Sequence, residues 1–135
     1  MRFMIMVKAT AISEAGVLPV DDSVMQEMGA FHEELARAGV LLDANGLRPS
    51  SQGWRVQYDK GGQRSIVDGP FAETKELLAG YTLIQVRSRD EAVEWARRFP
   101  APFGKGFECE IEVRPLYEPE DFEPGGVLSH EPARK

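Results

Sequence analysis

The chain has 135 residues, the usual size of one domain, and a net charge of −6 from 16 Lys and Arg against 22 Asp and Glu. A chain of this length buries enough surface to fold without a metal or a disulfide, and its single cysteine, Cys109, has no partner within the chain. No stretch gathers Lys and Arg densely enough to displace counterions from phosphates, which disfavours direct binding to nucleic acid.

The N-terminal run from Phe3 to Val7 is apolar at every position. It is too short for a signal-peptide core or a membrane span, so we expect a cytoplasmic protein with no membrane contact. Continuous apolar character is typical of a central strand that is covered on both faces. The sequence therefore predicts that Phe3–Val7 is such a strand.

A helix is predicted next, because apolar residues recur at helical spacing and give a buried stripe. The stripe consists of Val24, Met28, Phe31 and Leu35. Gly39 is well placed to end this helix, since glycine is common just past a helix C-terminus.

Several short strands follow. Val40–Leu42 reads as one, and Trp54–Tyr58 alternates with Trp54, Val56 and Tyr58 on one face. The turn sequence Asp59-Lys-Gly-Gly62 sends the chain back through Ile66 and Val67, which predicts a β-hairpin.

The last part of the body repeats the strand and helix pattern. Tyr81–Val86 is strand-like, and Ser88 with Glu91 forms a capping box that opens a helix ending at Pro100. From Phe107 to Val113, apolar and charged residues alternate as in a half-buried strand.

This order of elements predicts an α+β fold: a ferredoxin-like split βαβ arrangement with an antiparallel sheet and both helices on one face. Two helices leave the other sheet face uncovered. Either Met4 and Met6, or Phe3, Ile5 and Val7, would then face a second subunit. A homodimer with sheet against sheet is therefore expected.

The segment Asp68–Glu76, DGPFAETKE, combines three acids, one lysine, a Gly-Pro pair and an aromatic residue. Gly69, Pro70 and Phe71 suit a rigid corner anchored in the core. Asp68, Glu73 and Lys75 remain as candidates for chemistry. Spacing alone favours a well-capped corner without chemistry, because such residue types are common in turns.

The string DGPFAETKE closely resembles the DGPF branch of the YCII-related family. The resemblance extends to Phe31-His-Glu-Glu-Leu35, to Gly46-Leu47-Arg48-Pro49 and to Glu94-Trp95-Ala96, and covers roughly residues 1 to 115. It implies a dimeric α/β barrel, a His and Asp pair in a cleft, and an association with extracytoplasmic-function sigma factors. The family's histidine position falls on Gly29 here, one turn before His32.

Two hypotheses about function follow. In the first, a cleft binds or transforms a small molecule, with Asp68 or Glu73 as proton acceptor and Lys75 or His32 steadying an anionic group. In the second, the protein is a regulatory module that works with a sigma factor. A third and plainer reading is a dimeric scaffold in which the corner only holds the barrel together.

Residues 116–135 differ from residues 1–115, the expected domain. They carry five acids, two bases and three of the nine prolines, so an extended, partly disordered acidic tail is predicted. No phosphate-binding glycine loop and no paired histidines occur, and no cofactor or metal is expected.

Overall fold

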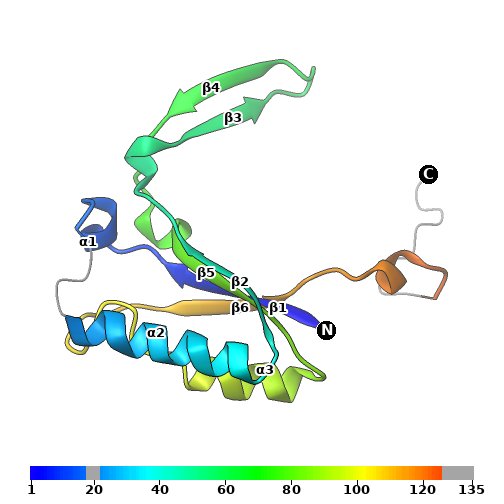
Figure 1. Ribbon diagram of the computed structural model, residues 1–135. Coiled ribbons are helices and arrows are strands. Elements are labelled where there is room, and N and C mark those ends of the chain that lie inside the picture. Colours follow the sequence, from blue (N-terminus) through cyan, green and yellow to red (C-terminus); the bar gives the residue numbers. More distant parts are fainter. Residues whose placement is uncertain (18–21, 126–135) are drawn as a thin grey trace.

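The computed structural model describes residues 1–17 and 22–125, and four antiparallel strands in it form one sheet in the order β2-β5-β1-β6. Two helices, α2 (Asp22–Arg37) and α3 (Arg89–Arg97), cover one face of this sheet (Figure 1). The four strands are β1 (Arg2–Lys8), β2 (Leu41–Gly46), β5 (Leu78–Gln85) and β6 (Ile111–Pro115). The predicted α+β class is confirmed, and the strand order is consistent with a ferredoxin-like fold.

The core lies between the sheet and the two helices. Phe3 and Ile5 of β1 and Ile84 of β5 point toward Phe31 and Leu35 of α2, and all five side chains are buried. Because side chains alternate along a strand, the neighbours of Phe3 and Ile5 must lie on the opposite face. The sequence left open which set of β1 residues faces the helices, and the structure assigns that role to Phe3 and Ile5.

The opposite face of the sheet carries Met4 and Met6, each only half-buried. Their antiparallel partners on β5 are Leu83 and Tyr81, which are half-buried too. We call Met4, Met6, Tyr81 and Leu83 the open face. Within the described residues, no helix covers this face (Figure 1).

Gly39 and Ser88 mark helix boundaries as predicted, whereas α3 ends at Arg97 and not at the predicted Pro100. Gly39 follows α2 with a φ of +77°, a backbone conformation that only glycine adopts at little cost. Ser88 accepts a hydrogen bond from the Glu91 amide at the start of α3. The Glu91 carboxylate accepts from the Arg87 amide, one residue before the Ser88 cap, so the reciprocal half of the predicted box is displaced by one residue.

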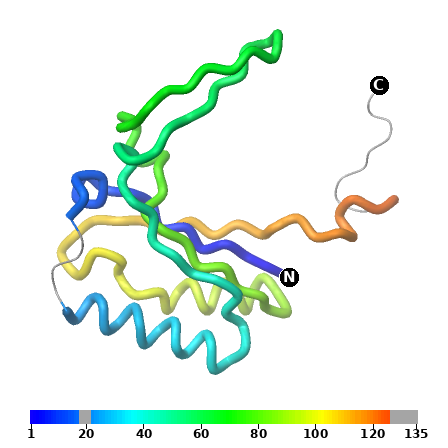
Figure 2. Tube along the Cα trace, turned by 45° about the horizontal axis from the view of Figure 1, so that its top comes forward, coloured from blue at the N-terminus to red at the C-terminus, as the bar shows by residue number. Residues whose placement is uncertain are grey.

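Strands β3 (Trp54–Tyr58) and β4 (Arg64–Asp68) form the predicted hairpin as a separate two-stranded sheet. The hairpin projects from the body on the side of the sheet away from the helices (Figures 1 and 2). All ten residues of the two strands are exposed. Alternation along β3 predicted a strand correctly, but it carries no information on which sheet the strand joins.

Strand β6 begins at Ile111, so the predicted start at Phe107 is wrong. Val7 pairs with Ile111, and the last bond between the two segments runs from the Lys8 amide to the Glu110 carbonyl oxygen, so β1 offers no partner to residues before Glu110. Gly104 and Gly106 have positive φ angles and turn the chain in this region. The alternation of apolar and charged residues therefore begins at Phe107, four residues before the strand itself.

The segment after β6 is held to the first strand. The Leu116 amide donates to the Arg2 carbonyl oxygen, and the Arg2 guanidinium pairs with the Glu118 carboxylate at 3.2 Å. The hydrogen bond from the Arg2 side chain lowers the pKa of Glu118 below its ordinary value. This contribution to stability is present at neutral pH and is lost as the pH falls through the lowered pKa.

A short helical turn, η3 (Pro119–Phe122), follows Glu118. The rest of the predicted tail, residues 126–135, lies outside the described residues. None of the helices in the described part of the chain is both long and apolar enough to cross a bilayer.

Candidate functional site

A cleft of about 1040 Å³ opens beside the edge strand β2. Its lining comes from β1, α2, β2, β5, the loop before η1 (Ser50–Gln52), the short helix α1 (Ala11–Glu14) and the segment after α3. Much of the lining is apolar and includes Val7, Met28, Leu41, Leu47, Phe99 and Phe103. This size is at the upper end of the range for small-molecule sites in proteins.

His32 lies in the lining of the cleft and both of its ring nitrogens have partners. Nδ1 lies 2.8 Å from the Met28 carbonyl oxygen, and Nε2 lies 2.7 Å from the Thr82 hydroxyl. Because a carbonyl oxygen only accepts, Nδ1 carries the proton and donates to Met28, and Nε2 accepts from Thr82 in the neutral ring. His32 is therefore held in one tautomer and one orientation.

A second polar group in the lining is equally well satisfied. The Tyr81 hydroxyl donates to Asp43 Oδ2 at 2.8 Å, while Asp43 Oδ1 accepts from the Ala44 amide and from Asn45 Nδ2. Asn45 Nδ2 also donates to the Tyr81 hydroxyl. The negative charge of Asp43 is thus already surrounded by three donors from the protein.

Among the described residues that line the cleft, Arg48 is the one Lys or Arg, and Asp43 is the one Asp or Glu. Its guanidinium has one acceptor among the described residues, Gln52 Oε1 at 3.2 Å. A guanidinium has five N–H donors, so Arg48 keeps donors available for an anion. The charge that the lining can offer to a ligand is consequently positive.

The corner after β4 contacts the wall of the cleft through Ser50. The Ser50 hydroxyl accepts from the Phe71 amide and donates to the Glu14 carboxylate, which also accepts from the Ser50 amide. The Gly69 amide donates to the Gly53 carbonyl oxygen. The corner is thereby joined to the segment Pro49–Gln52, where Pro49 and Gln52 line the cleft.

Gly69 lies so close to Ser50 that no side chain fits between them. A Cβ atom built on Gly69 would lie 1.8 Å from the Ser50 carbonyl oxygen, far inside van der Waals contact. The requirement for glycine in this corner therefore comes from its close approach to the backbone of the cleft wall.

Of the four site residues predicted from the sequence, His32 lies in the cleft lining and the other three do not. Asp68, Glu73 and Lys75 are exposed, and none of their side chains makes a hydrogen bond or an ion pair with a described residue. Within one chain, His32 and the three corner residues do not form a single constellation. The corner supports the cleft wall through Ser50, while its charged residues are not part of the cleft lining.

Sequence reasoning did not single out four residues that shape the cleft: Glu14, Ser50, Tyr81 and Thr82. Thr82 is a buried polar residue, 2% exposed, and Glu14 binds Ser50, which lies 36 residues further along the chain. Neither role leaves a recognisable motif in the neighbouring sequence. A signal did exist for α1, because Thr10 and Ser13 form a reciprocal capping box. Arg48 lay within the Gly46–Pro49 string that carried the family resemblance.

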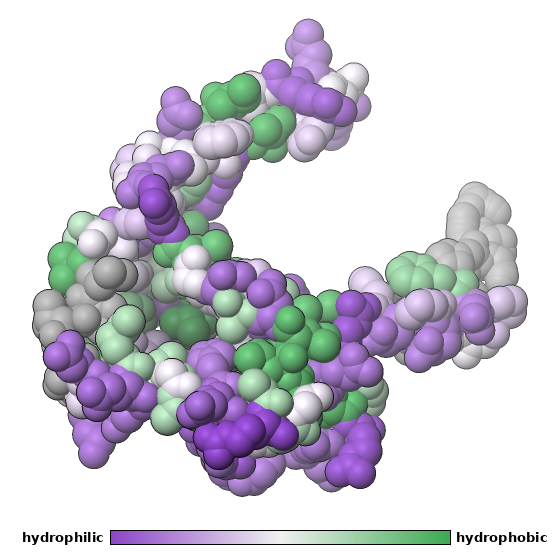
Figure 3. Space-filling view, viewed as in Figure 1, coloured by the Kyte–Doolittle hydropathy of each residue, from purple (hydrophilic) through white to green (hydrophobic). Residues whose placement is uncertain are grey.

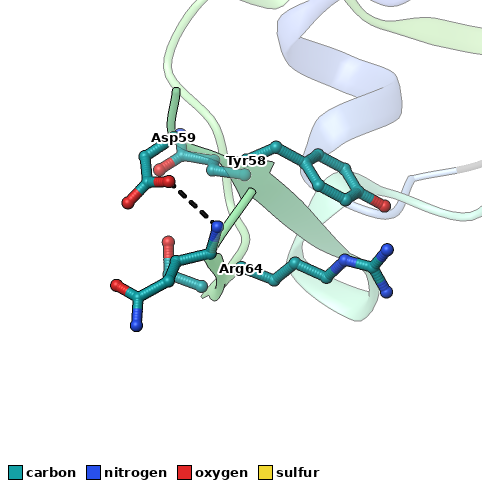
Figure 4. A pocket seen from close by; sticks show the side chains of 6 residues that line it. Tyr58, Asp59 and Arg64 are labelled. Atoms are coloured by element: carbon teal, nitrogen blue, oxygen red, sulfur yellow. Dashed lines mark hydrogen bonds between the residues drawn. The ribbon is translucent and has the colours of Figure 1, made fainter. Parts of the chain in front are cut away.

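A second hollow of about 590 Å³ lies at the far end of the hairpin (Figure 4). Asp59 Oδ1 accepts from the amides of Gly61 and Gln63 there, and the Arg64 guanidinium lies 5.0 Å from the Tyr58 ring centre. These polar groups stabilise the hairpin turn. We therefore regard the cleft beside β2 as the better candidate for a site.

Within residues 1–17 and 22–125, no three His, Cys, Asp or Glu side chains come together as a metal site would require. The polar groups of His32 and Tyr81 already form hydrogen bonds with other groups of the protein. What the cleft can do chemically is hold an apolar molecule and offer a cation to it.

Comparison with known proteins supports the resemblance at the level of the YCII-related family. Residues 1–117 match the YCII-related domain, and the chain belongs to this family. The chain is also similar to an uncharacterized protein of Rhizobium meliloti (strain 1021), with 33% identity over 99 residues. The match covers 73% of this chain and 79% of that protein.

The corner provides the first prediction. We expect Gly69→Ala and Ser50→Ala each to lower the free energy of unfolding by about 1–3 kcal/mol, the first through steric overlap and the second through lost hydrogen bonds. Asp68→Asn, at an exposed side chain, should stay within about 0.5 kcal/mol of the parent. Urea denaturation measures all three.

Gly29→Ala is the matched control, because Gly29 lies in α2 with nothing within 4 Å of an added Cβ. It should raise stability by up to about 1 kcal/mol. A large loss for Asp68→Asn, with Ser50→Ala neutral, would contradict this account of the corner.

Proposed function

We propose that this protein is a small-molecule-binding protein whose site is the cleft beside β2. The observation that carries the proposal is an apolar cleft in which the polar groups of His32, Asp43 and Tyr81 are already hydrogen-bonded within the protein. Such a lining favours a ligand with an apolar body, because it asks for few new hydrogen bonds. The free donors of Arg48 favour an anionic group at one end of that ligand.

The placement of His32 supports binding over acid and base catalysis. For its Nε2 to accept a substrate proton, the ring would first have to give up the hydrogen bond from Thr82. The corner acids Asp68 and Glu73, proposed above as proton acceptors, lie outside the lining. An enzymatic role for them requires a site other than this cleft, and we assign them no catalytic step.

The string DGPFAETKE supports placing the chain in the DGPF branch of its family. We also propose that a second copy of the chain covers the open face. The half-buried Met4, Met6, Tyr81 and Leu83 form a continuous apolar strip along two paired strands, and two such strips can cover each other across a two-fold axis. The proposal of a cytoplasmic homodimer rests on this strip and on the sequence.

The cleft proposal predicts that octanoate binds more tightly than octanamide. A partly exposed ion pair with Arg48 contributes about 1 kcal/mol, which corresponds to roughly fivefold in the dissociation constant. Arg48→Gln should remove the preference and leave octanamide binding unchanged. Isothermal titration calorimetry on the full chain measures both ligands.

Two variants sharpen this experiment. Leu47→Asn changes an exposed apolar residue of the lining and should weaken both ligands, whereas Arg87→Gln, which removes a distant exposed cation, should alter neither. Equal binding of the two ligands would refute the role of Arg48. If neither ligand binds, or if Leu47→Asn leaves both affinities unchanged, the cleft is not the binding site.

The second candidate function is a regulatory module that binds a sigma factor of the extracytoplasmic-function class. The segment Leu116–Glu123 favours it, because four acids and no base surround the exposed aromatic residues Tyr117 and Phe122. Acidic segments with exposed aromatic side chains are suited to docking on a basic protein surface.

A co-purification experiment tests this candidate. The full chain should retain the sigma factor and a chain ending at Leu116 should lose it. Equal recovery from the two chains would remove the segment from the interaction.

A further inference from the structure

The hairpin β3–β4 exposes several large apolar side chains, which is typical of a surface that binds a partner. Trp54 is 64% exposed, Tyr58 63% and Ile66 69%. A two-stranded hairpin that packs on nothing is only marginally stable in water. Large exposed apolar patches on a folded protein mark interaction sites.

The cross-strand register collects these side chains on one side. Trp54, Val56 and Tyr58 alternate along β3, and Ile66 lies directly opposite Val56. We call Trp54, Val56, Tyr58 and Ile66 the hairpin face. Its edges are charged, since Arg64 pairs with Tyr58 and Asp68 pairs with Trp54.

The hairpin is fixed to the body at its base. The Arg55 guanidinium lies 3.7 Å from the centre of the Phe71 ring, and the Gly69 amide bonds to the Gly53 carbonyl oxygen. Phe71 in turn is held by Ser50. The hairpin face is therefore presented in a set direction before any partner arrives, which lowers the entropic cost of binding.

The surroundings of the hairpin form a concave space. The hairpin rises on one side of the open face and the described part of the C-terminal segment extends outward on the other, which leaves a hollow between them (Figures 1 and 3). Green apolar patches are visible both on the hairpin and near the floor of this hollow in Figure 3. Any partner seated here meets apolar surface from more than one element.

We propose that the hairpin is an arm that clasps a second copy of this chain, with its hairpin face against the C-terminal segment of that copy. Charge complementarity identifies the occupant. Residues 54–68 carry a net +1; Arg55 lies against Phe71 at the base, and the other two bases, Lys60 and Arg64, lie at the turn end of the hairpin near Tyr58. Residues 116–123 carry four acids and no base; Glu118 is paired with Arg2 of its own chain, and Glu120, Asp121 and Glu123 supply the remaining −3.

Apolar groups match as well as charges. Tyr117 is 60% exposed and its ring lies 5.5 Å from that of Phe122, which is 48% exposed. This aromatic pair sits among the acids, just as the hairpin face sits beside Arg64. Because each copy has one hairpin and one C-terminal segment, a two-fold axis satisfies both pairs at once.

The arm contact goes beyond the pairing of open faces proposed above, and either contact can fail without the other. Tryptophan side chains at the centre of a contact commonly dominate its energy, and Ile66 is the most exposed apolar residue of the hairpin face. The double variant Trp54→Ser, Ile66→Ser should therefore weaken the dimer at least about a hundredfold. Sedimentation equilibrium of the full chain measures the dissociation constant, and Met25→Ser, at an exposed methionine of α2, should leave it unchanged.

Charge reversal tests the choice of partner segment. Lys60→Glu with Arg64→Glu should weaken the dimer about tenfold, and adding Glu120→Lys with Glu123→Lys in the same chain should restore it. All these positions are exposed, so circular dichroism should show the parent fold in each variant.

Three outcomes would overturn the arm contact. The parent chain could stay monomeric at high concentration, the hairpin variants could leave the dissociation constant unchanged, or the added Glu120→Lys and Glu123→Lys could fail to restore the dimer. If Leu83→Asp dissociates the dimer while the hairpin variants do not, the pairing of open faces stands alone. If the hairpin variants dissociate it and Leu83→Asp does not, the arm contact holds and the pairing of open faces falls.

Discussion

The close approach of Gly69 to the Ser50 carbonyl oxygen is the constraint on which the rest of this structure depends. It brings three segments that are distant in sequence to one point: α1 through Glu14, the loop at Ser50, and the corner after β4. The same point fixes the wall of the cleft and the base of the hairpin. The two surfaces to which we assign functions, the cleft and the hairpin face, therefore share one support.

This arrangement gives the conspicuous corner motif a physical role. Gly69 permits a close backbone contact, and the Phe71 amide donates a hydrogen bond to Ser50. The Phe71 ring makes a cation–π contact with Arg55. The charged residues Asp68, Glu73 and Lys75 are exposed and make none of these contacts. Gly69 and Phe71 of the segment thus position the cleft wall, and the cleft itself offers an apolar lining, a fixed His32 and the cation of Arg48.

Local patterns in the sequence were sufficient for most of the fold. Helical spacing of apolar residues, Gly39 and Ser88 located both long helices, and the Asp59–Gly62 turn located the hairpin. The place of the hairpin outside the main sheet could not be predicted, because alternation along β3 does not specify a partner strand. The start of β6 at Ile111 depends on where β1 ends, which is a property of the pairing and not of either strand alone.

The candidate site was harder to predict than the fold. His32 was a candidate from the sequence, one turn after the family's histidine position, but its partner Thr82 lies 50 residues away and carries no local signal. Ser50 and Glu14 are likewise joined only by folding. A polar pair that forms across the fold has no period in the sequence, so only the structure could show that these groups satisfy one another.

The methionine methyl groups provide the most direct test of the cleft, because they sample three regions of the molecule. Met28 lines the cleft, Met4 and Met6 lie on the open face, and Met25 is exposed on α2. In a ¹³C-methyl NMR titration of the methionine-labelled full chain with octanoate, the account predicts that the Met28 resonance shifts and saturates while that of Met25 does not move. Saturable shifts at Met4 and Met6 with Met28 unmoved would place the ligand on the open face and contradict it.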